Sequence, residues 1–181
     1  VRRLRHLPIL LTNGLKLKQA EYVRRLKSAG LRTVHLSMNG GLDNDLYFAV
    51  DDLRCAADKC AALDNLCSAR AFITVGMILV PDVNVRHLRD FWRHLAVRPQ
   101  VREVHFRSIG QMGRYIETPG FSLGEMFEIV VQALGTTVSS IRIEYHDAHN
   151  CDFWFAGRKI VITQWPDLGS KSRGRLAPSG M

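Results

Sequence analysis

The sequence predicts an α/β protein built on a parallel β-sheet, either a barrel or an open sheet, with a β-hairpin near the C-terminus. Short apolar runs alternate with amphipathic segments along most of the 181 residues. The first two runs end in hydrogen-bonding residues and glycine, at Thr12-Asn13-Gly14 and Ser37-Met38-Asn39-Gly40. In parallel sheets such endings lie at the carboxyl edge, where ligands bind.

The expected elements follow one another as strand and helix. Residues 71–80 form a continuous apolar run that is typical of a strand buried on both faces. The helices are predicted from apolar residues spaced three and four apart, and Ser122 with Glu125 forms a capping box at the start of the last one. The expected strands are residues 9–11, 33–36, 71–80, 101–106 and 141–145. The expected helices are residues 17–29, 45–66, 85–95 and 123–134.

The alternation ends after Tyr145. Residues 153–155 and 159–164 flank Ala156-Gly157-Arg158, which predicts a hairpin with Gly157 at a positive φ angle. From Leu168 onward Gly, Ser, Lys, Arg and Pro dominate, and we expect a disordered tail. The predicted organisation is therefore residues 1–150 for the βα repeat, 151–167 for a hairpin extension and 168–181 for the tail.

The net charge of +8 is concentrated at the two ends of the chain. A nucleic-acid surface should instead lie on the folded body and include aromatic residues, so we favour solvated termini over nucleic-acid binding. No apolar run reaches the roughly 18 residues of a transmembrane helix, and the apolar segment at residues 7–11 is too short for a signal peptide. We therefore expect a cytoplasmic protein. The charged end residues are Arg2, Arg3, Arg5, Lys171, Arg173 and Arg175.

No metal site is expected from the cysteines or histidines. The spacings of the first three cysteines, five and seven residues, match neither a zinc pair nor an iron–sulfur loop. Cys60 and Cys67 fall on an apolar helix face, where we expect them to pack in the core. His146, Asp147 and His149 follow the fifth strand, and a solvated loop is favoured over a metal site. The four cysteines are Cys55, Cys60, Cys67 and Cys151.

The residues at the strand ends carry amides, hydroxyls and one arginine. They include no Ser/His/Asp arrangement and no GxxxxGK phosphate loop. Such a set can bind a polar ligand but contains no strong general base. The candidates for ligand contacts are Asn13, Ser37, Asn39, Asn84 and Arg107.

An ordered series of motifs over residues 6–134 resembles the third and fourth βα units of radical SAM enzymes, and their continuation. In that family a hydrophobic strand ends in Thr-Asn-Gly, and the next strand ends in Ser-hydrophobic-Asp/Asn-Gly. The matching segments here are Leu10–Gly14, Glu21–Leu31, Val34–Gly40, Asn84, Val104–Arg107, Gly113-Arg114 and Ser122-Leu123.

The resemblance implies a partial (βα) barrel that holds S-adenosylmethionine across its strand ends. It places Ser37 near the amino-acid or ribose part of that cofactor, and the strand at residues 73–77 and the loop after Phe106 near its adenine. Asn13, Asn39, Asn84 and Arg107 are then expected to contact the cofactor or a substrate. The substrate and reaction type are not indicated, because this family methylates, inserts sulfur, rearranges and modifies peptides on one scaffold.

The chain departs from the family pattern in one important respect. The CxxxCxxC loop that ligates a [4Fe–4S] cluster is absent, as is the Gly-Gly-Glu segment. We therefore expect a carboxyl-terminal portion of a radical SAM enzyme, inert in radical generation, whose cluster belongs to a longer parent. An edge left open at the first strand would favour self-association. The alternatives are a degenerate homologue that only binds a ligand or partner, a different βα-repeat enzyme, or a basic nucleic-acid-binding protein.

Overall fold

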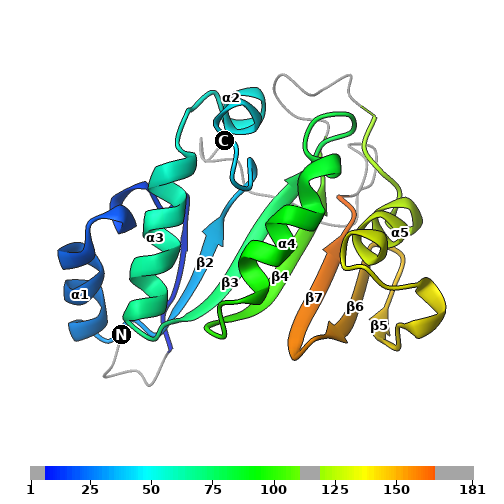
Figure 1. Cartoon of the computed structure of the whole chain (residues 1–181). Coiled ribbons are helices and arrows are strands. Elements are labelled where there is room, and N and C mark those ends of the chain that lie inside the picture. The colour runs from blue at the N-terminus through cyan, green and yellow to red at the C-terminus, as the bar shows by residue number, and fades with distance from the viewer. Residues whose placement is uncertain (1–6, 111–118, 166–181) are drawn as a thin grey trace, which may run out of the picture.

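The computed structural model describes residues 7–110 and 119–165, which form one seven-stranded sheet with helices (Figure 1). The predicted tail from residue 168 and the Gly113-Arg114 segment lie outside the described residues. The strand order is β1-β2-β3-β4-β7-β6-β5. The strands are β1 (Ile9–Thr12), β2 (Thr33–Ser37), β3 (Phe72–Leu79), β4 (Val101–Ser108), β5 (Ile143–His146), β6 (Asn150–Phe155) and β7 (Arg158–Thr163).

The sheet is mostly parallel, as the alternation of strands and helices predicts. Strands β1, β2, β3, β4 and β7 lie side by side in this order and run parallel to one another. Strand β6 is antiparallel to β7, and β5 is antiparallel to β6. The α/β class and the antiparallel hairpin near the C-terminus are therefore confirmed.

The strand beside β4 differs from the expected one. Residues 141–145 were expected to continue the parallel series, but β7 occupies that position and β5 lies at the far edge of the sheet. The reason is burial. Ile160 and Ile162 on β7 are fully buried, whereas all four residues of β5 are exposed. The hairpin is thus an integral part of the sheet, and its second strand completes the parallel series.

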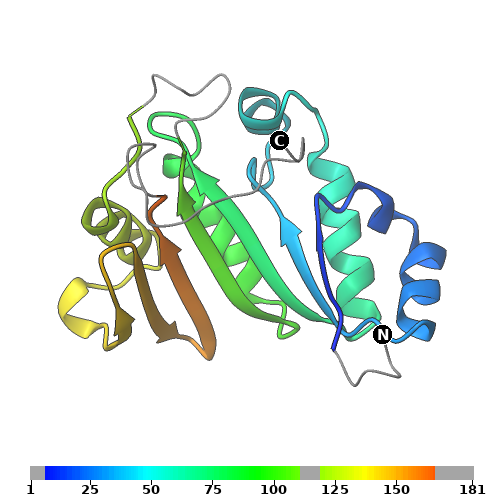
Figure 2. The same cartoon turned by 180° about the vertical axis from the view of Figure 1, so that it is seen from behind.

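The helices pack on one face of the sheet, as the two opposite views show (Figures 1 and 2). Helices α3, α4 and α5 lie against the strands, and α1 packs beside α3. Between these layers lies the core, which includes Leu36, Val75, Phe106, Phe91 and Val130. The helices are α1 (Ala20–Ser28), α2 (Asn44–Asp51), α3 (Ala56–Ser68), α4 (Leu88–Ala96) and α5 (Leu123–Ala133), with 3₁₀ turns η2 (Leu15–Lys18), η3 (Val85–His87) and η5 (Val138–Ser140).

No described helix covers the opposite side of the sheet, which we call the open face (Figure 2). Side chains alternate along β4: Val104 and Phe106 are buried on the helix side, while Glu103, His105 and Arg107 are partly exposed on the open face. The open face is therefore the side of the sheet on which polar side chains gather.

The single long helix expected over residues 45–66 is wrong. Two helices, α2 and α3, replace it, and Asp52 ends the first in a left-handed conformation with φ of 57°. Asp43 caps the start of α2 by accepting hydrogen bonds from the amides of Asp45 and Leu46. Asn44 Oδ1 in turn accepts from the amide of Ala56 at 2.9 Å. The Asp43 and Asn44 side chains thus accept hydrogen bonds from backbone amides at the starts of α2 and α3. These two caps explain why the segment forms two helices and not one.

Other local predictions are confirmed. The capping box of Ser122 and Glu125 begins α5, with both reciprocal hydrogen bonds formed. Ala156 and Gly157 join β6 to β7 with φ angles of 48° and 73°, which gives the predicted tight hairpin turn. The expectation that Cys60 and Cys67 are buried in the core is wrong: both are only partly buried, and Cys67 packs against the edge of the core. The buried cysteines are Cys55 and Cys151.

The first strand lies at the edge of the sheet. Ile9 and Leu11 on β1 are 62% and 68% exposed among the described residues. Self-association through this edge stays a prediction. Within residues 7–110 and 119–165, no helix has the length and apolar character required to cross a membrane.

Candidate functional site

A cavity of about 330 Å³ opens on the open face, at the carboxyl ends of β1 to β4. Ligand cavities commonly start at this size, and this edge of a parallel sheet is where they occur. Apolar groups also line it, from Leu11, Met77 and Ile78. The polar residues along its wall are Thr12, Asn13, His35, Ser37, Asn39 and Arg107.

The cavity brings together four of the five residues proposed from the sequence. Asn13 follows β1, Ser37 ends β2, Asn39 follows β2 and Arg107 lies near the end of β4. Residues 13 and 107 are far apart in sequence, and the parallel strand order places both at the same edge.

The loop after β1 is shaped by its own hydrogen bonds. Thr12 Oγ1 accepts from the amide of Gly14 at 3.0 Å, and Asn13 Oδ1 accepts from the amide of Leu15 at 3.3 Å. Gly14 has a φ of 80°, and a Cβ there would lie 2.3 Å from Leu36 Cδ1. Glycine is therefore required at this position both for the backbone angle and for the close approach to β2.

Asn39 is largely occupied by the protein itself. Its amide Nδ2 donates to Asp51 Oδ1 at 2.9 Å, and its Oδ1 accepts from the amide of Ile78 at 3.0 Å. The residue is only 7% exposed. Asn39 therefore ties the loop after β2 to α2 and to β3, and offers little surface to a ligand.

Asn84 lies outside this cavity, buried behind Asn39. Its Nδ2 donates to the carbonyls of Asn39 at 2.9 Å and Ile78 at 2.7 Å, while its Oδ1 accepts from the amide of Val80 at 3.0 Å. It borders instead a separate cavity of about 240 Å³, together with His87 and Asp90. The structure thus places Asn84 as a support of the loop that carries Asn39.

Lys59 is a site-supporting residue that the sequence analysis missed. Its Nζ donates to the carbonyl of Ser37 at 2.8 Å and lies 5.4 Å from the centre of the Tyr47 ring. The residue is 2% exposed, and burial lowers the pKa of its ammonium group. Its position on the buried side of α3, three residues after Ala56 and four before Leu63, was the available signal.

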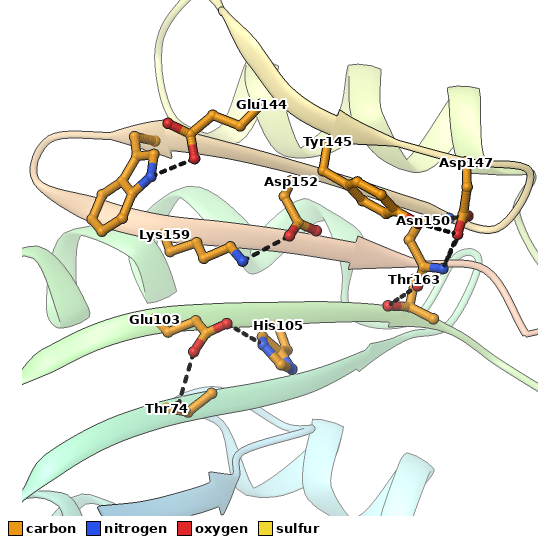
Figure 3. Close-up of polar contacts among 11 residues, drawn as sticks. Thr74, Glu103, His105, Glu144, Tyr145, Asp147, Asn150, Asp152, Lys159 and Thr163 are labelled. Carbon is orange, nitrogen blue, oxygen red and sulfur yellow. Dashed lines mark hydrogen bonds and ion pairs between the residues drawn. The ribbon is translucent and has the colours of Figure 1, made fainter.

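Sequence reasoning also missed three polar residues of the open face, His35, Glu103 and His105. His105 Nε2 lies 2.7 Å from Glu103 Oε1, and Glu103 also accepts from Thr74 Oγ1 at 3.4 Å (Figure 3). The rings of His35 and His105 meet edge to face, with centres 4.9 Å apart. The hydrogen bond from His105 is the main reason that the pKa of Glu103 is lowered.

His35 is held uncharged at neutral pH. Burial, followed by the nearby His105 and Arg107, lowers its pKa from 6.5 to about 4. Because the unfolded chain then binds more protons between pH 6.5 and pH 4, the folded state loses stability as the pH falls through that range.

We expect this loss to be absent in a His35→Gln variant. Between pH 6.5 and pH 4.5, the free energy of unfolding of the wild type should fall by roughly 1 to 2 kcal/mol more than that of the variant. This range takes into account that the His35 ring is partly exposed. Urea denaturation at several pH values measures the difference. His94, whose pKa burial also lowers, lies on α4, and His94→Gln is the matched control that should retain the His35 contribution. Parallel pH profiles for wild type and His35→Gln would contradict the assignment.

The described residues do not fit an iron–sulfur cluster. Across residues 7–110 and 119–165, no group of three or more His, Cys, Asp or Glu side chains is placed to hold a metal ion. The four cysteines are all free thiols. Burial raises the pKa of each of them, which disfavours the thiolate that a metal requires.

Together these features define an α/β protein with a ligand-sized cavity, lined by both polar and apolar residues, at the carboxyl edge of four parallel strands. Over 111 residues the chain is 31% identical to 7,8-dihydro-6-hydroxymethylpterin dimethyltransferase of Methanocaldococcus jannaschii. The match covers 60% of this chain and 22% of the relative, so the chain corresponds to about a fifth of that protein's length. No family model matches the chain.

Proposed function

We propose that the chain is the S-adenosylmethionine-binding part of a radical SAM enzyme core. The observation that carries the proposal is the cavity on the open face, where Asn13, Ser37, Asn39 and Arg107 come together from separate strand ends. The partial match to a dimethyltransferase agrees with it, because methylation is one of the reactions of the family that the sequence resembles.

The groups around the cavity suit this ligand chemically. The Arg107 guanidinium offers donors for a carboxylate, and Ser37 and Asn13 offer groups for hydroxyls and amines. Leu11, Met77 and Ile78 provide apolar surface for an adenine ring or a thioether chain. When bound, S-adenosylmethionine supplies a sulfonium centre that yields a methyl group or, on reduction, a radical.

The one-sided arrangement of helices supports a partial barrel. In a (βα) barrel the helices cover the outside of the strands, and the inner face carries the side chains of the active site. Here α3, α4 and α5 lie on one face, and Glu103, His105 and Arg107 of β4 lie on the other. We accordingly assign the open face as the inner face of such a barrel.

Radical chemistry in the family that the sequence resembles requires a [4Fe–4S] cluster held by a CxxxCxxC motif. The CxxxCxxC motif is absent from the sequence, and the described cysteines are not grouped. We propose that the ligands of any [4Fe–4S] cluster lie outside this sequence, and that the chain by itself binds S-adenosylmethionine without producing a radical. The substrate is not assigned.

Arg107→Ala is expected to weaken S-adenosylmethionine binding by about tenfold to a hundredfold. This is the loss of one charge-assisted hydrogen bond, about 1.5 to 3 kcal/mol. Isothermal titration calorimetry on the whole chain measures it. Arg89→Ala is the matched control, because Arg89 is exposed on α4, on the helix side of the sheet.

Two results would overturn the proposal. The first is a wild-type chain that does not bind S-adenosylmethionine at millimolar concentration, which would favour a different βα-repeat enzyme. The second is equal affinity of the wild type and Arg107→Ala, which would place the ligand elsewhere on the molecule.

A further inference from the structure

Among the residues that the structure describes, His35 and Arg107 are the two basic side chains along the wall of the cavity on the open face. His35 lies on β2, next to Leu11 of β1 and Thr74 of β3 in the register of the sheet. Arg107 lies on β4, paired with Ile78 of β3. One β-strand therefore separates them, and both side chains stand on the same face.

The position of the His35 ring is tightly specified. A Cβ at Gly76 would lie only 2.7 Å from His35 Nε2, so the absence of a side chain at position 76 makes room for the ring. On its other side the ring meets His105, which Glu103 holds by the 2.7 Å contact to Nε2. Such packing keeps His35 in place whether or not it carries a proton.

Within residues 7–110 and 119–165, the charged groups that act on His35 come from β4. His105 and Arg107 disfavour its protonation, and Glu103 favours it. The neighbouring side chains on β1 and β3, Leu11 and Thr74, carry no charge. Among the described residues of the cavity wall, Arg107 is therefore the cationic side chain and the His35 imidazole is neutral.

We propose that His35 and Arg107 form a carboxylate-binding pair, and that entry of the carboxylate is coupled to protonation of His35. The proposal rests on the proposed function of this cavity as the ligand site. A solvent proton forms an N–H bond with the unprotonated ring nitrogen of His35, no bond of the ligand breaks, and the new imidazolium then pairs with the carboxylate. Glu103 acts through His105 as a positioning residue.

The carboxylate has two possible sources, S-adenosylmethionine itself or a second molecule bound beside it. The chemistry at His35 is the same in both cases. An anion near the ring compensates the effects of Arg107 and burial, which is the ordinary way in which a neighbouring charge raises the pKa of a histidine. Binding should consequently strengthen as the pH falls through the raised pKa of His35, and a rise of one pH unit in that pKa corresponds to a gain in affinity of at most about tenfold.

The test is an NMR titration of the whole chain labelled at the histidine ring carbons, with His35→Gln to assign the signal. With acetate at matched ionic strength, we expect the pKa of His35 to rise from about 4 to about 5 or above. Arg107→Gln should abolish the rise, and Arg89→Gln should not. In Glu103→Gln the His105 signal should show a mixture of tautomers, since the carboxylate no longer fixes Nε2–H.

Three ligand arms identify the source of the carboxylate. A rise with S-adenosylmethionine but not with its decarboxylated analogue assigns the carboxylate to that cofactor. A rise that S-adenosylmethionine does not produce, but that acetate produces when added to the cofactor-bound chain, assigns it to a second molecule.

The proposal is overturned if no carboxylate changes the pKa of His35, or if Arg107→Gln leaves the change intact. Failure of the proposed function is seen separately, as a chain whose signals do not move with S-adenosylmethionine. In that case the acetate arm still decides whether the pair binds a carboxylate.

Discussion

Replacing Asn84 with leucine is expected to lower the free energy of unfolding by about 3 to 5 kcal/mol. The side chain is 1% exposed and makes three hydrogen bonds to the backbone, with Val80, Asn39 and Ile78. Leucine has a similar volume but leaves one amide and two carbonyls buried without this partner, and each such group costs about 1 to 3 kcal/mol. Urea denaturation followed by circular dichroism measures the change.

A polar-to-leucine change at an exposed position provides the control. Gln132 is exposed on α5, and Gln132→Leu should change stability by no more than about 0.5 kcal/mol. If Asn84→Leu costs less than about 1 kcal/mol, water or a local shift satisfies the backbone groups, and the supporting role is wrong. Because Asn84 holds the Asn39 carbonyl, the variant should also weaken ligand binding in the cavity.

Gly40→Ala is expected to lower the free energy of unfolding by about 2 to 4 kcal/mol. A Cβ at this position would lie 2.4 Å from the Tyr47 ring and 2.5 Å from the Tyr47 backbone nitrogen. Tyr47 is completely buried, and its hydroxyl donates to the carbonyl of Gly41, so neither the ring nor the backbone can move without cost. Overpacking of this kind costs 1 to 3 kcal/mol, or more where backbone must shift.

Gly124→Ala is the matched control for this substitution. Gly124 lies in the first turn of α5, where an added Cβ would have no neighbour within 4 Å. The change should be neutral or stabilising by up to about 1 kcal/mol, since alanine restricts the unfolded chain. Thermal denaturation of the two variants side by side compares them, and equal melting temperatures would contradict the close approach at Gly40.

Local sequence signals predicted most of the elements but not their order. Apolar runs indicated the strands, and Ser122 with Glu125 correctly marked the start of α5. The place beside β4 was misjudged because it depends on which strand can bury more apolar surface. Ile160 and Ile162 outcompete the exposed segment at residues 143–146, and that is a comparison between distant segments.

The candidate site was predictable where it depends on strand ends. Asn13, Ser37, Asn39 and Arg107 line one cavity because parallel strands share an edge, which strand endings reveal. The sequence did not reveal that the Asn39 and Asn84 side-chain amides form hydrogen bonds with the backbone. An asparagine that binds a ligand and one that supports a loop look the same in a sequence. His35, Glu103 and His105 were missed because they lie within strands rather than after them.

The helix layer on one side of the sheet has a consequence for how such a protein changes over time. Neighbouring residues on β4 face opposite sides, so positions 103, 105 and 107 can be exchanged without repacking Val104 and Phe106. Mutation can therefore alter ligand preference on one side while selection for folding acts on the other. Among proteins that descend from a common ancestor with this arrangement, we expect ligand preference to change faster than the fold.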